Sequence, residues 1–357
     1  MKRIDALRQI MRDQKLDGVI FSKPENRYYL SGFRGSTGTV LITADQQYFL
    51  TDFRYIAQAK DQCPDYAVLQ ISPADPIYGH INRLVTGRLG FEDDFMTVEN
   101  YGLYRSKLEA EMVPMKRLIE TLRLYKDETE IELMAKAQQI ADEAFEHILT
   151  YIKPGVREID VANELIRVMK EKGATGESFE IIVASGVRGA LPHGVASEKS
   201  IEAGELVTLD FGCVYHGYCS DMTRTVAVGP VSEKHRHIYE TVRKAQETAL
   251  AAVRPGITGQ ELDKIARDII TEAGFGEHFG HGLGHGVGLE VHEGPSISKA
   301  GTTPIEPGMV ITDEPGIYLD GFGGVRIEDI ILVTEDGKRV LSSSPKELIE
   351  LAIEEGK

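Results

Sequence analysis

The hydrophobic positions of the first part of the chain alternate between helical spacing and short apolar runs. Ile4, Leu7, Ile10 and Met11 recur at the spacing of one helix face, and the segment 52–55 opens a second predicted helix. The apolar runs between these helices are only a few residues long, which is typical of buried strands, and they lie at 18–21, 40–42 and 48–50. The pattern indicates a small α/β domain.

A charged stretch at 126–130 then precedes a long pattern of apolar residues at helical spacing. Asp127 or Thr129 would cap this helix, and the acids of its first turn suit the positive end of the helix dipole. We place the domain boundary where the pattern changes. We therefore expect an N-terminal α/β domain over residues 1–125 and a second, α+β domain over residues 126–357.

The second domain contains an internal repeat. A Pro-Gly pair, at 154–155 and again at 255–256, is followed in each copy by a predicted helix that ends at a glycine. Further matches lie downstream, in the pairs Thr208 with Thr312, Asp210 with Glu314, and Gly212 with Gly316. Two such halves facing each other would bring Asp210 and Glu314 together across a pseudo-twofold axis. The alternative is two similar units whose acids coincide by chance.

Each copy also carries a predicted hairpin with two acids. In the first copy Asp210 ends the apolar run 206–209, and the chain turns near Tyr215 and His216. Asp221 then returns nearly opposite Asp210 on the second strand.

The second hairpin repeats this arrangement. Glu314 follows the segment Val310-Ile311-Thr312-Asp313, the chain turns through 320–324, and Glu328 returns at the mirror position. Because side chains alternate along a strand, Arg326 lies on the same face as Glu328.

Opposed carboxylates on a buried face repel each other and lose hydration, so they persist only around a cation or a shared proton. A single acid pair would more often lie on the solvated surface. Two pairs related by a repeat predict a cage for divalent metal ions, and four acids indicate two ions rather than one.

Nitrogen ligands for such ions are available in a segment rich in histidine and glycine. His278, His281 and His285 alternate with glycines, which let backbone and ligand approach closely, and His292 follows. His193 takes roughly the place in the first copy that His292 takes in the second. We therefore expect histidines to face each other across the axis.

Composition narrows the class of protein. The chain has 357 residues, 40 basic against 56 acidic, and a formal charge of -16, so its surface repels phosphate backbones and we expect no nucleic-acid partner. No apolar run is long enough to span a membrane, and the charged N-terminal residues do not resemble a signal peptide. Three cysteines are too few and odd in number for a disulfide framework. We expect a cytoplasmic protein without a membrane partner.

These motifs resemble the pita-bread metallopeptidases and, within them, the branch of Xaa-Pro aminopeptidases and prolidases. The resemblance covers essentially the whole chain: the first domain, with its segments 29–33 and 51–55, is similar to the small creatinase-like domain of these enzymes. The matching segments of the second domain are 182–186, 191–194, Leu209-Asp210-Phe211-Gly212, 220–225, 281–289, Val291-His292-Glu293, Thr312-Asp313-Glu314-Pro315-Gly316 and 325–329. The implied fold is a creatinase-like α/β domain followed by a pita-bread domain with an internal pseudo-twofold repeat.

The resemblance also implies a set of site residues. The metal ligands would be Asp210, Asp221, His285, Glu314 and Glu328. Asp221 would chelate one ion, His285 and Glu314 would complete the other site, and the remaining two acids would reach both ions. The non-ligand active-site residues would be His193, His281, His292 and Arg326, with Glu314 also moving a proton.

The activity that the resemblance implies is removal of an N-terminal residue that precedes proline, by a hydroxide activated between two divalent ions. Oxygen-rich ligation with one imidazole favours Mn²⁺, with Co²⁺, Fe²⁺ and Zn²⁺ as alternatives. The partners would be a peptide with proline at its second position and a second copy of the chain in a homodimer.

Substrate length is the open question within this branch. Compact prolidases often carry an arginine shortly after the Val-His-Glu segment, whereas this chain continues with Gly294, Pro295 and Ser296. We therefore expect an Xaa-Pro aminopeptidase that acts on longer peptides, with a strict Xaa-Pro dipeptidase as the alternative. Methionine aminopeptidase and creatinase fit less well, because the first lacks such an N-terminal domain and the second lacks the metal set. A non-catalytic binding module is the remaining alternative.

Overall fold

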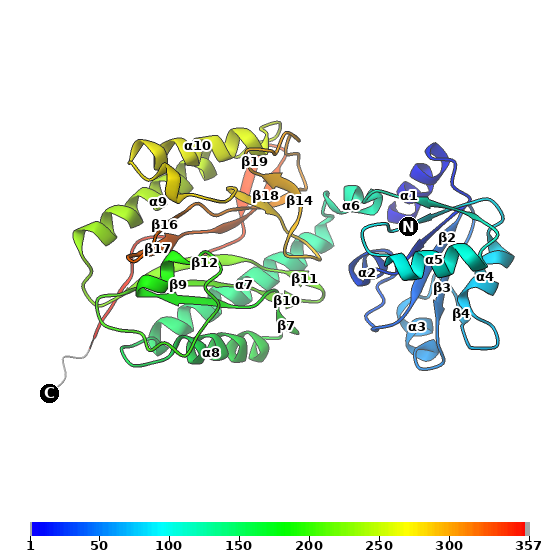
Figure 1. The fold of residues 1–357 in the computed structure, drawn as a ribbon, viewed down its shortest axis with the longest axis horizontal. Coiled ribbons are helices and arrows are strands. Elements are labelled where there is room, and N and C mark those ends of the chain that lie inside the picture. Colours follow the sequence, from blue (N-terminus) through cyan, green and yellow to red (C-terminus); the bar gives the residue numbers. More distant parts are fainter. Residues whose placement is uncertain (1, 354–357) are drawn as a thin grey trace. The chain divides into compact units, whose positions relative to one another are not determined.

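The computed structural model describes residues 2–353 and divides into two compact units, one ending at Arg123 and the other beginning at Leu124 (Figure 1). We describe each unit by itself. Among the described residues, no helix combines the length and the apolar character that a membrane crossing requires.

The N-terminal unit is built on a six-stranded mixed sheet in the order β4-β3-β2-β1-β5-β6. The strands predicted from the three apolar runs are present, and the first two are buried along their whole length. The strands are β1 Gly18–Phe21, β2 Thr39–Thr43, β3 Gln47–Thr51, β4 Ala67–Gln70, β5 Arg88–Phe91 and β6 Glu111–Pro114. The helices are α1 Lys2–Asp13, α2 Pro24–Ser31, α3 Ile56–Gln62, α4 Ile77–Leu84, α5 Val98–Lys107 and α6 Leu118–Arg123.

The C-terminal unit consists of two copies of one arrangement, a pair of helices followed by antiparallel strands. The first copy contains α7 Glu128–Tyr151, α8 Glu158–Glu171, β7 Gly176–Glu177, β8 Ile182–Ser185, the short helix η1 Gly186–Ala190, β9 Leu206–Phe211, β10 Cys213–Tyr215, β11 Tyr218–Cys219 and β12 Met222–Val228. The second copy contains α9 Glu233–Ala252, α10 Gly259–Glu272, η2 Gly276–His278, β13 Gly284–Gly286, β14 Glu293–Ile297, β15 Val310–Asp313, β16 Gly316–Leu319, β17 Gly323–Arg326 and β18 Asp329–Thr334, followed by β19 Gly337–Val340 and β20 Glu350–Leu351.

Of the two predicted cap residues, Asp127 caps α7. Its carboxylate accepts a hydrogen bond from the Glu130 N–H, and the Glu130 carboxylate accepts one from the Asp127 N–H, each at 3.0 Å. This reciprocal pair satisfies two N–H groups that the first turn of a helix leaves unpaired.

The sequence repeat corresponds to a structural repeat. The Gly155 N–H donates to the Ile201 carbonyl in the first copy, and the Gly256 N–H donates to the Ile305 carbonyl in the second, both at 2.8 Å. Both glycines have positive φ, 90° and 85°, a conformation that favours glycine. Each copy also buries its own cluster of apolar side chains between its helices and strands.

The register of the first hairpin differs from the prediction. Its turn consists of His216 and Gly217, both with positive φ, and lies one residue later than predicted. Since the turn fixes the register of a hairpin, Asp210 lies opposite Thr223 rather than Asp221. The two acids are therefore offset by two positions along the strand pair.

The register of the second hairpin is as predicted. Asp313 at the end of β15 lies opposite Asp329 at the start of β18, so Glu314 and Glu328 follow at facing positions. The ladder between β16 and β17 continues the same register.

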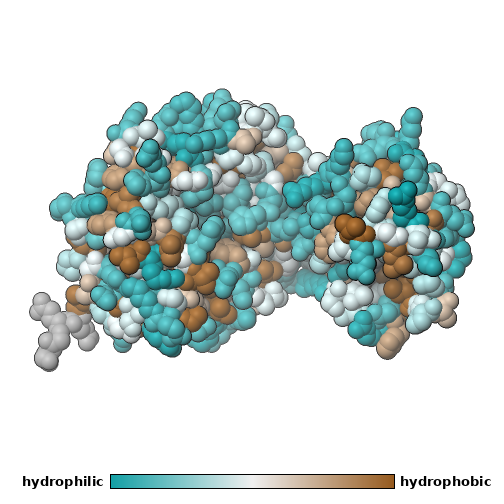
Figure 2. Space-filling model, viewed as in Figure 1, coloured by the Kyte–Doolittle hydropathy of each residue, from teal (hydrophilic) through white to brown (hydrophobic). Residues whose placement is uncertain are grey.

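The surface of the C-terminal unit is predominantly polar in the view of Figure 2, where apolar residues form small groups between hydrophilic ones. The apolar side chains are instead concentrated in the two core clusters. These cores support the sheets whose strand ends carry the predicted acids.

Candidate metal centre and active site

A cavity of about 820 Å³ opens in the C-terminal unit at the ends of the strands that carry the predicted acids. The structure brings all of the predicted site residues to its wall: Asp210, Asp221, His285, Glu314, Glu328, His193, His281, His292 and Arg326. These residues come from both copies of the repeat. Acids and histidines of both copies therefore converge on one cavity.

His285 is in contact with two of the acids. Its Nε2 lies 3.2 Å from Oε1 of Glu314 and 3.6 Å from Oδ2 of Asp221. Its Nδ1 lies 3.0 Å from the Gly286 carbonyl, which can only accept a hydrogen bond. In the neutral ring this contact leaves the Nε2 lone pair directed at the acids, as a metal ligand requires.

Three of these side chains meet the spacing of a metal site among the described residues. One potential ligand atom from each of Asp221, His285 and Glu328 lies within 4.8 Å of the others. Two of the three donors are carboxylates and one is an imidazole, a set that binds divalent transition metals.

Asp210 approaches the same cavity from β9. Its Oδ2 accepts a hydrogen bond of 2.5 Å from Nη2 of Arg326, whereas its Oδ1 is buried without a hydrogen-bond partner. A buried carboxylate oxygen without a donor is energetically costly unless a cation or water contacts it.

The charges at the site are poorly compensated by the protein alone. Burial, and then repulsion from Asp210, raises the pKa of Asp221 well above its usual range, and burial with repulsion from Asp221 does the same for Glu328. Burial would lower the pKa of His285, but its hydrogen bond to Glu314 and the nearby acids raise it to about 9. Without a cation, the protein thus disfavours the ionised forms of Asp221 and Glu328. The orphaned Asp210 oxygen and these raised pKa values fit a centre built for divalent cations.

A hydrogen-bond chain leads from Asp210 to His281. Arg326 donates through Nη1 to the Tyr318 hydroxyl at 2.8 Å, and this hydroxyl lies 2.8 Å from Nε2 of His281. Nδ1 of His281 lies 2.7 Å from the Gly282 carbonyl and so carries the proton of the neutral ring. Because burial lowers the pKa of His281 and raises that of Tyr318 to about 12, the hydroxyl donates to the imidazole.

His193 and His292 line the cavity but are exposed to solvent. The ring of His292 lies edge-on to that of His285, with 4.3 Å between the ring centroids. Burial and the neighbouring His285 lower the pKa of His292, so its ring is neutral at pH 7. These two histidines are free to contact a bound substrate.

Two buried anchors fix the loops that carry the histidines. Glu158 on α8 is fully buried and accepts hydrogen bonds from Ser197 in the loop of His193, from its N–H at 3.2 Å and from its hydroxyl at 2.6 Å. Asp263 on α10 accepts from the Leu283 N–H at 3.1 Å and pairs with Arg267. Arg267 in turn donates to the His281 carbonyl at 2.7 Å, so both anchors hold the loops through their main chain.

The sequence pattern did not identify Tyr318, Asp263 or Glu158. Apart from Arg267, which follows Asp263 by four residues, their partners lie on other elements of the fold, so no motif marks these three residues as part of the site. The two cysteines of the first hairpin, Cys213 and Cys219, are buried and do not line the cavity.

Comparison with known proteins agrees with this geometry. The family model described as metallopeptidase family M24 matches residues 132–335, and that of the creatinase/prolidase N-terminal domain matches residues 3–125. A solved structure, the Xaa-Pro dipeptidase from Bacillus anthracis, is 49% identical with a TM-score of 0.96, covering 98% of this chain and 99% of that one.

Of two further relatives, one is also called an Xaa-Pro dipeptidase and the other an X-Pro aminopeptidase. The Xaa-Pro dipeptidase of Pyrococcus furiosus is 42% identical over 98% of this chain and 99% of its own length. The structure of an X-Pro aminopeptidase from Thermotoga maritima is 36% identical with a TM-score of 0.89, over 94% of this chain and 97% of that one. With a creatinase-type N-terminal domain followed by a pita-bread catalytic domain, the chain belongs to metallopeptidase family M24.

Proposed function

We propose that this protein is an Xaa-Pro dipeptidase, which hydrolyses the bond between an N-terminal residue and a C-terminal proline. The observation that carries the proposal is full-length similarity to proteins of that name, 49% identical to the one from Bacillus anthracis and 42% identical to the one from Pyrococcus furiosus. Both similarities extend over both domains, so the assignment does not depend on the shared catalytic fold alone.

The comparisons favour this dipeptidase over the aminopeptidase that we expected from the sequence. That expectation relied on Ser296 at a position where compact prolidases carry an arginine. The cavity wall offers other groups that bind a terminal carboxylate, since the exposed imidazoles of His193, His278 and His292 lie on it. An aminopeptidase remains the second candidate, on the similarity to the enzyme from Thermotoga maritima.

The ligands of two divalent ions would be Asp210, Asp221, His285, Glu314 and Glu328, as the resemblance implies. When bound, such ions lower the pKa of water and polarise the scissile carbonyl. Four carboxylates and one imidazole favour Mn²⁺, and Co²⁺, Fe²⁺ or Zn²⁺ are compatible with the same donors. The metal identity is thus part of the proposal.

The remaining side chains act on the peptide itself. Glu314 would take a proton on its carboxylate during attack and return it to the departing proline nitrogen, as a general base and then a general acid. His292 and His193 would donate hydrogen bonds to the oxygen of the tetrahedral intermediate or hold the substrate. Both have exposed rings at the cavity wall, where a substrate can reach them.

Arg326 would orient the site rather than react. Its guanidinium donates to Asp210 and to the Tyr318 hydroxyl, and so fixes one carboxylate oxygen of Asp210 and leaves the other free. His281, at the end of this chain of hydrogen bonds, would present a neutral ring beside the substrate.

The substrate-length test compares an Xaa-Pro dipeptide with the same dipeptide extended by two residues at its carboxyl end, after chelator treatment and readdition of Mn²⁺. The proposal predicts Mn²⁺-dependent cleavage of the dipeptide alone. Efficient cleavage of the longer peptide would make the protein an aminopeptidase. Cleavage of neither, with Mn²⁺ bound, would support a binding module. The expected homodimer is a separate prediction, tested by the mass of the protein in solution.

A further inference from the structure

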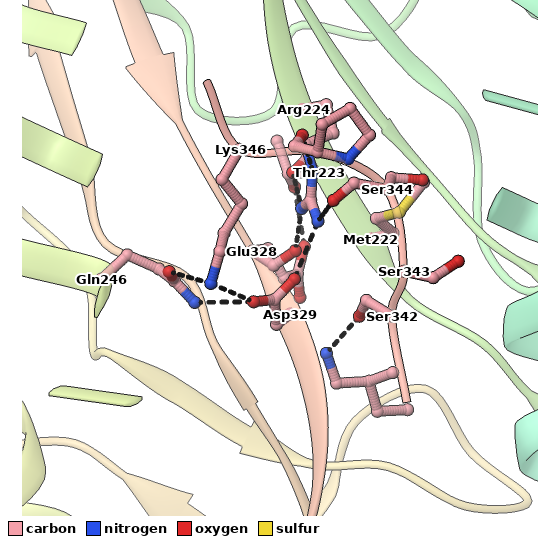
Figure 3. Close-up of polar contacts among 12 residues, drawn as sticks. Met222, Thr223, Arg224, Gln246, Glu328, Asp329, Ser342, Ser343, Ser344 and Lys346 are labelled. Carbon is pink, nitrogen blue, oxygen red and sulfur yellow. Dashed lines mark hydrogen bonds and ion pairs between the residues drawn. The ribbon is translucent and has the colours of Figure 1, made fainter. Parts of the chain in front are cut away.

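Behind the candidate metal centre lies a buried polar network that the proposed reaction does not use. Figure 3 shows the Asp329 carboxylate between the side chains of Arg224 and Lys346, beside the chain segment that carries Ser342, Ser343 and Ser344. We call residues 342–346, between β19 and β20, the C-terminal strap. The network joins β12, β18 and α9 to this strap.

Arg224 is the centre of the network and is almost completely buried. A guanidinium has five N–H groups, and here five acceptors surround it. They are the Pro345 carbonyl at 2.9 Å, the Thr223 carbonyl at 2.9 Å, the Glu328 carbonyl, Oδ1 of Asp329 at 2.8 Å and the Ser344 carbonyl at 2.7 Å. Every donor of the buried cation therefore has a partner.

Three of the contacts of Glu328 come from residues 223–224. The Glu328 N–H donates to the Thr223 carbonyl at 3.1 Å, and its own carbonyl accepts from Nη1 of Arg224. Oε2 of its carboxylate accepts from the Thr223 hydroxyl at 2.7 Å. The same hydroxyl accepts from Nε of Arg326 at 3.1 Å, which fixes the direction of its proton toward Glu328.

The C-terminal strap, which contacts Arg224, is itself fixed to both halves of the unit. The Ser343 and Ser344 N–H groups donate to the Asp142 carboxylate on α7, each at 2.9 Å. The Lys346 carbonyl accepts from the Tyr239 hydroxyl on α9 at 2.9 Å. The strap thus connects a helix of the first copy to a helix of the second, across the strands that carry the candidate ligands.

We propose that Thr223 and Arg224 are positioning residues that fix the main chain and carboxylate of Glu328, so that ligands from the two halves meet at one metal centre. The inference rests on the proposed metal function. Residues that orient a metal ligand in this way contribute to affinity without touching the ion.

The test is a Mn²⁺ titration of chelator-stripped protein, with thermal unfolding of the same samples. Arg224→Lys keeps the charge but lacks the five-donor fork. We expect it to fold and to bind at least one of the two ions about 10- to 100-fold more weakly. Arg243→Lys is the matched control, because it makes the same substitution on α9 at an arginine that pairs with Glu240 and Glu247, outside the network around Arg224. Its Mn²⁺ affinity should equal that of the wild type.

A second pair of variants tests the positioning of Glu328 if Arg224→Lys does not fold. Thr223→Val removes the hydroxyl that donates to Glu328 and keeps the side-chain shape, whereas Thr223→Ser keeps the hydroxyl. We expect weakened Mn²⁺ binding in the first and near wild-type binding in the second. Wild-type affinity in folded Arg224→Lys, or in Thr223→Val, would overturn the inference. Failure of the wild-type protein itself to bind Mn²⁺ would instead refute the proposed function.

Discussion

At the scale of single residues, the candidate centre shows how neighbours determine the charge of a buried carboxylate. Burial raises the pKa of Glu314 and Asp221 alike, but Glu314 has a hydrogen bond from His285 that brings its pKa below the usual range. For Asp221, repulsion from the nearby Asp210 adds to the effect of burial, and its pKa rises. The same cavity thus holds one carboxylate whose ionised form the protein favours and others whose ionised form it disfavours in the absence of a cation.

His292 provides a test of the catalytic assignment that is separate from metal binding. Its ring lies beside His285 but is not among the proposed ligands, so His292→Ala should bind Mn²⁺ as the wild type does. Loss of one donor to a developing oxyanion lowers turnover about 100- to 1,000-fold. Steady-state kinetics on an Xaa-Pro dipeptide measure the effect, with His216→Ala, at an exposed hairpin turn outside the cavity, as control. Unchanged turnover would remove His292 from the mechanism.

The raised carboxyl pKa values predict a pH-dependent effect of metal on stability. Asp221 and Glu328 bind protons more tightly in the folded, metal-free protein than in the unfolded chain. Their contribution to metal-free stability is therefore present below the ordinary carboxyl pKa of about 4 and is lost as pH rises through the raised values. A bound divalent cation offsets this loss of stability, because it neutralises the ionised carboxylates.

Melting temperatures of stripped and Mn²⁺-loaded protein, measured from about pH 4 to pH 8, test this linkage. We expect the difference in Tm between the two forms to widen as pH rises. A difference that stays constant or narrows would show that these acids are ionised without metal.

At the scale of elements, α10 anchors the histidine segment through Asp263 and Arg267. Asp263 is buried and takes both the Arg267 guanidinium, at 2.8 Å, and the Leu283 N–H. Asp263→Asn leaves the partly buried guanidinium of Arg267 without its counter-charge, which lowers the free energy of unfolding by about 3 kcal/mol. Turnover should also fall, because Arg267, which donates a hydrogen bond to the His281 carbonyl, is no longer held by Asp263.

Asp268→Asn, on the same helix, is the matched control for this substitution. Asp268 pairs with Lys264 at the surface, and both side chains are more than half exposed, so the change should stay within about 0.5 kcal/mol. Denaturant unfolding of both variants measures the difference. Equal effects of the two substitutions would contradict the anchoring role of Asp263.

Elements with local signals were predictable from the sequence, and contacts between distant strands were not. The helix cap at Asp127 and the second acid hairpin follow from residues close together in the chain. The first hairpin was placed one residue off because its turn depends on the positive φ of His216 and Gly217. The sequence predicts a turn at Tyr215 and His216, whereas the structure has it at His216 and Gly217.

At the scale of the whole molecule, the repeat explains why most of the site could be predicted from the sequence. Matched acids in two similar halves must meet once the halves face each other, whatever the details of packing. The contacts that hold the halves together carry no such signal. Arg224 and Asp329 each lie in a motif segment, but they are 105 positions apart and nothing in either segment indicates that they pair. Those contacts could be identified only in the three-dimensional structure.

The most direct test of the account is anomalous diffraction at the manganese edge from crystals grown with Mn²⁺. The account predicts two peaks in the cavity of the C-terminal unit, held by Asp210, Asp221, His285, Glu314 and Glu328. A single ion held by only some of these residues would contradict the two-ion assignment. Absence of any peak among them at a Mn²⁺ concentration that supports dipeptide cleavage would contradict the account as a whole.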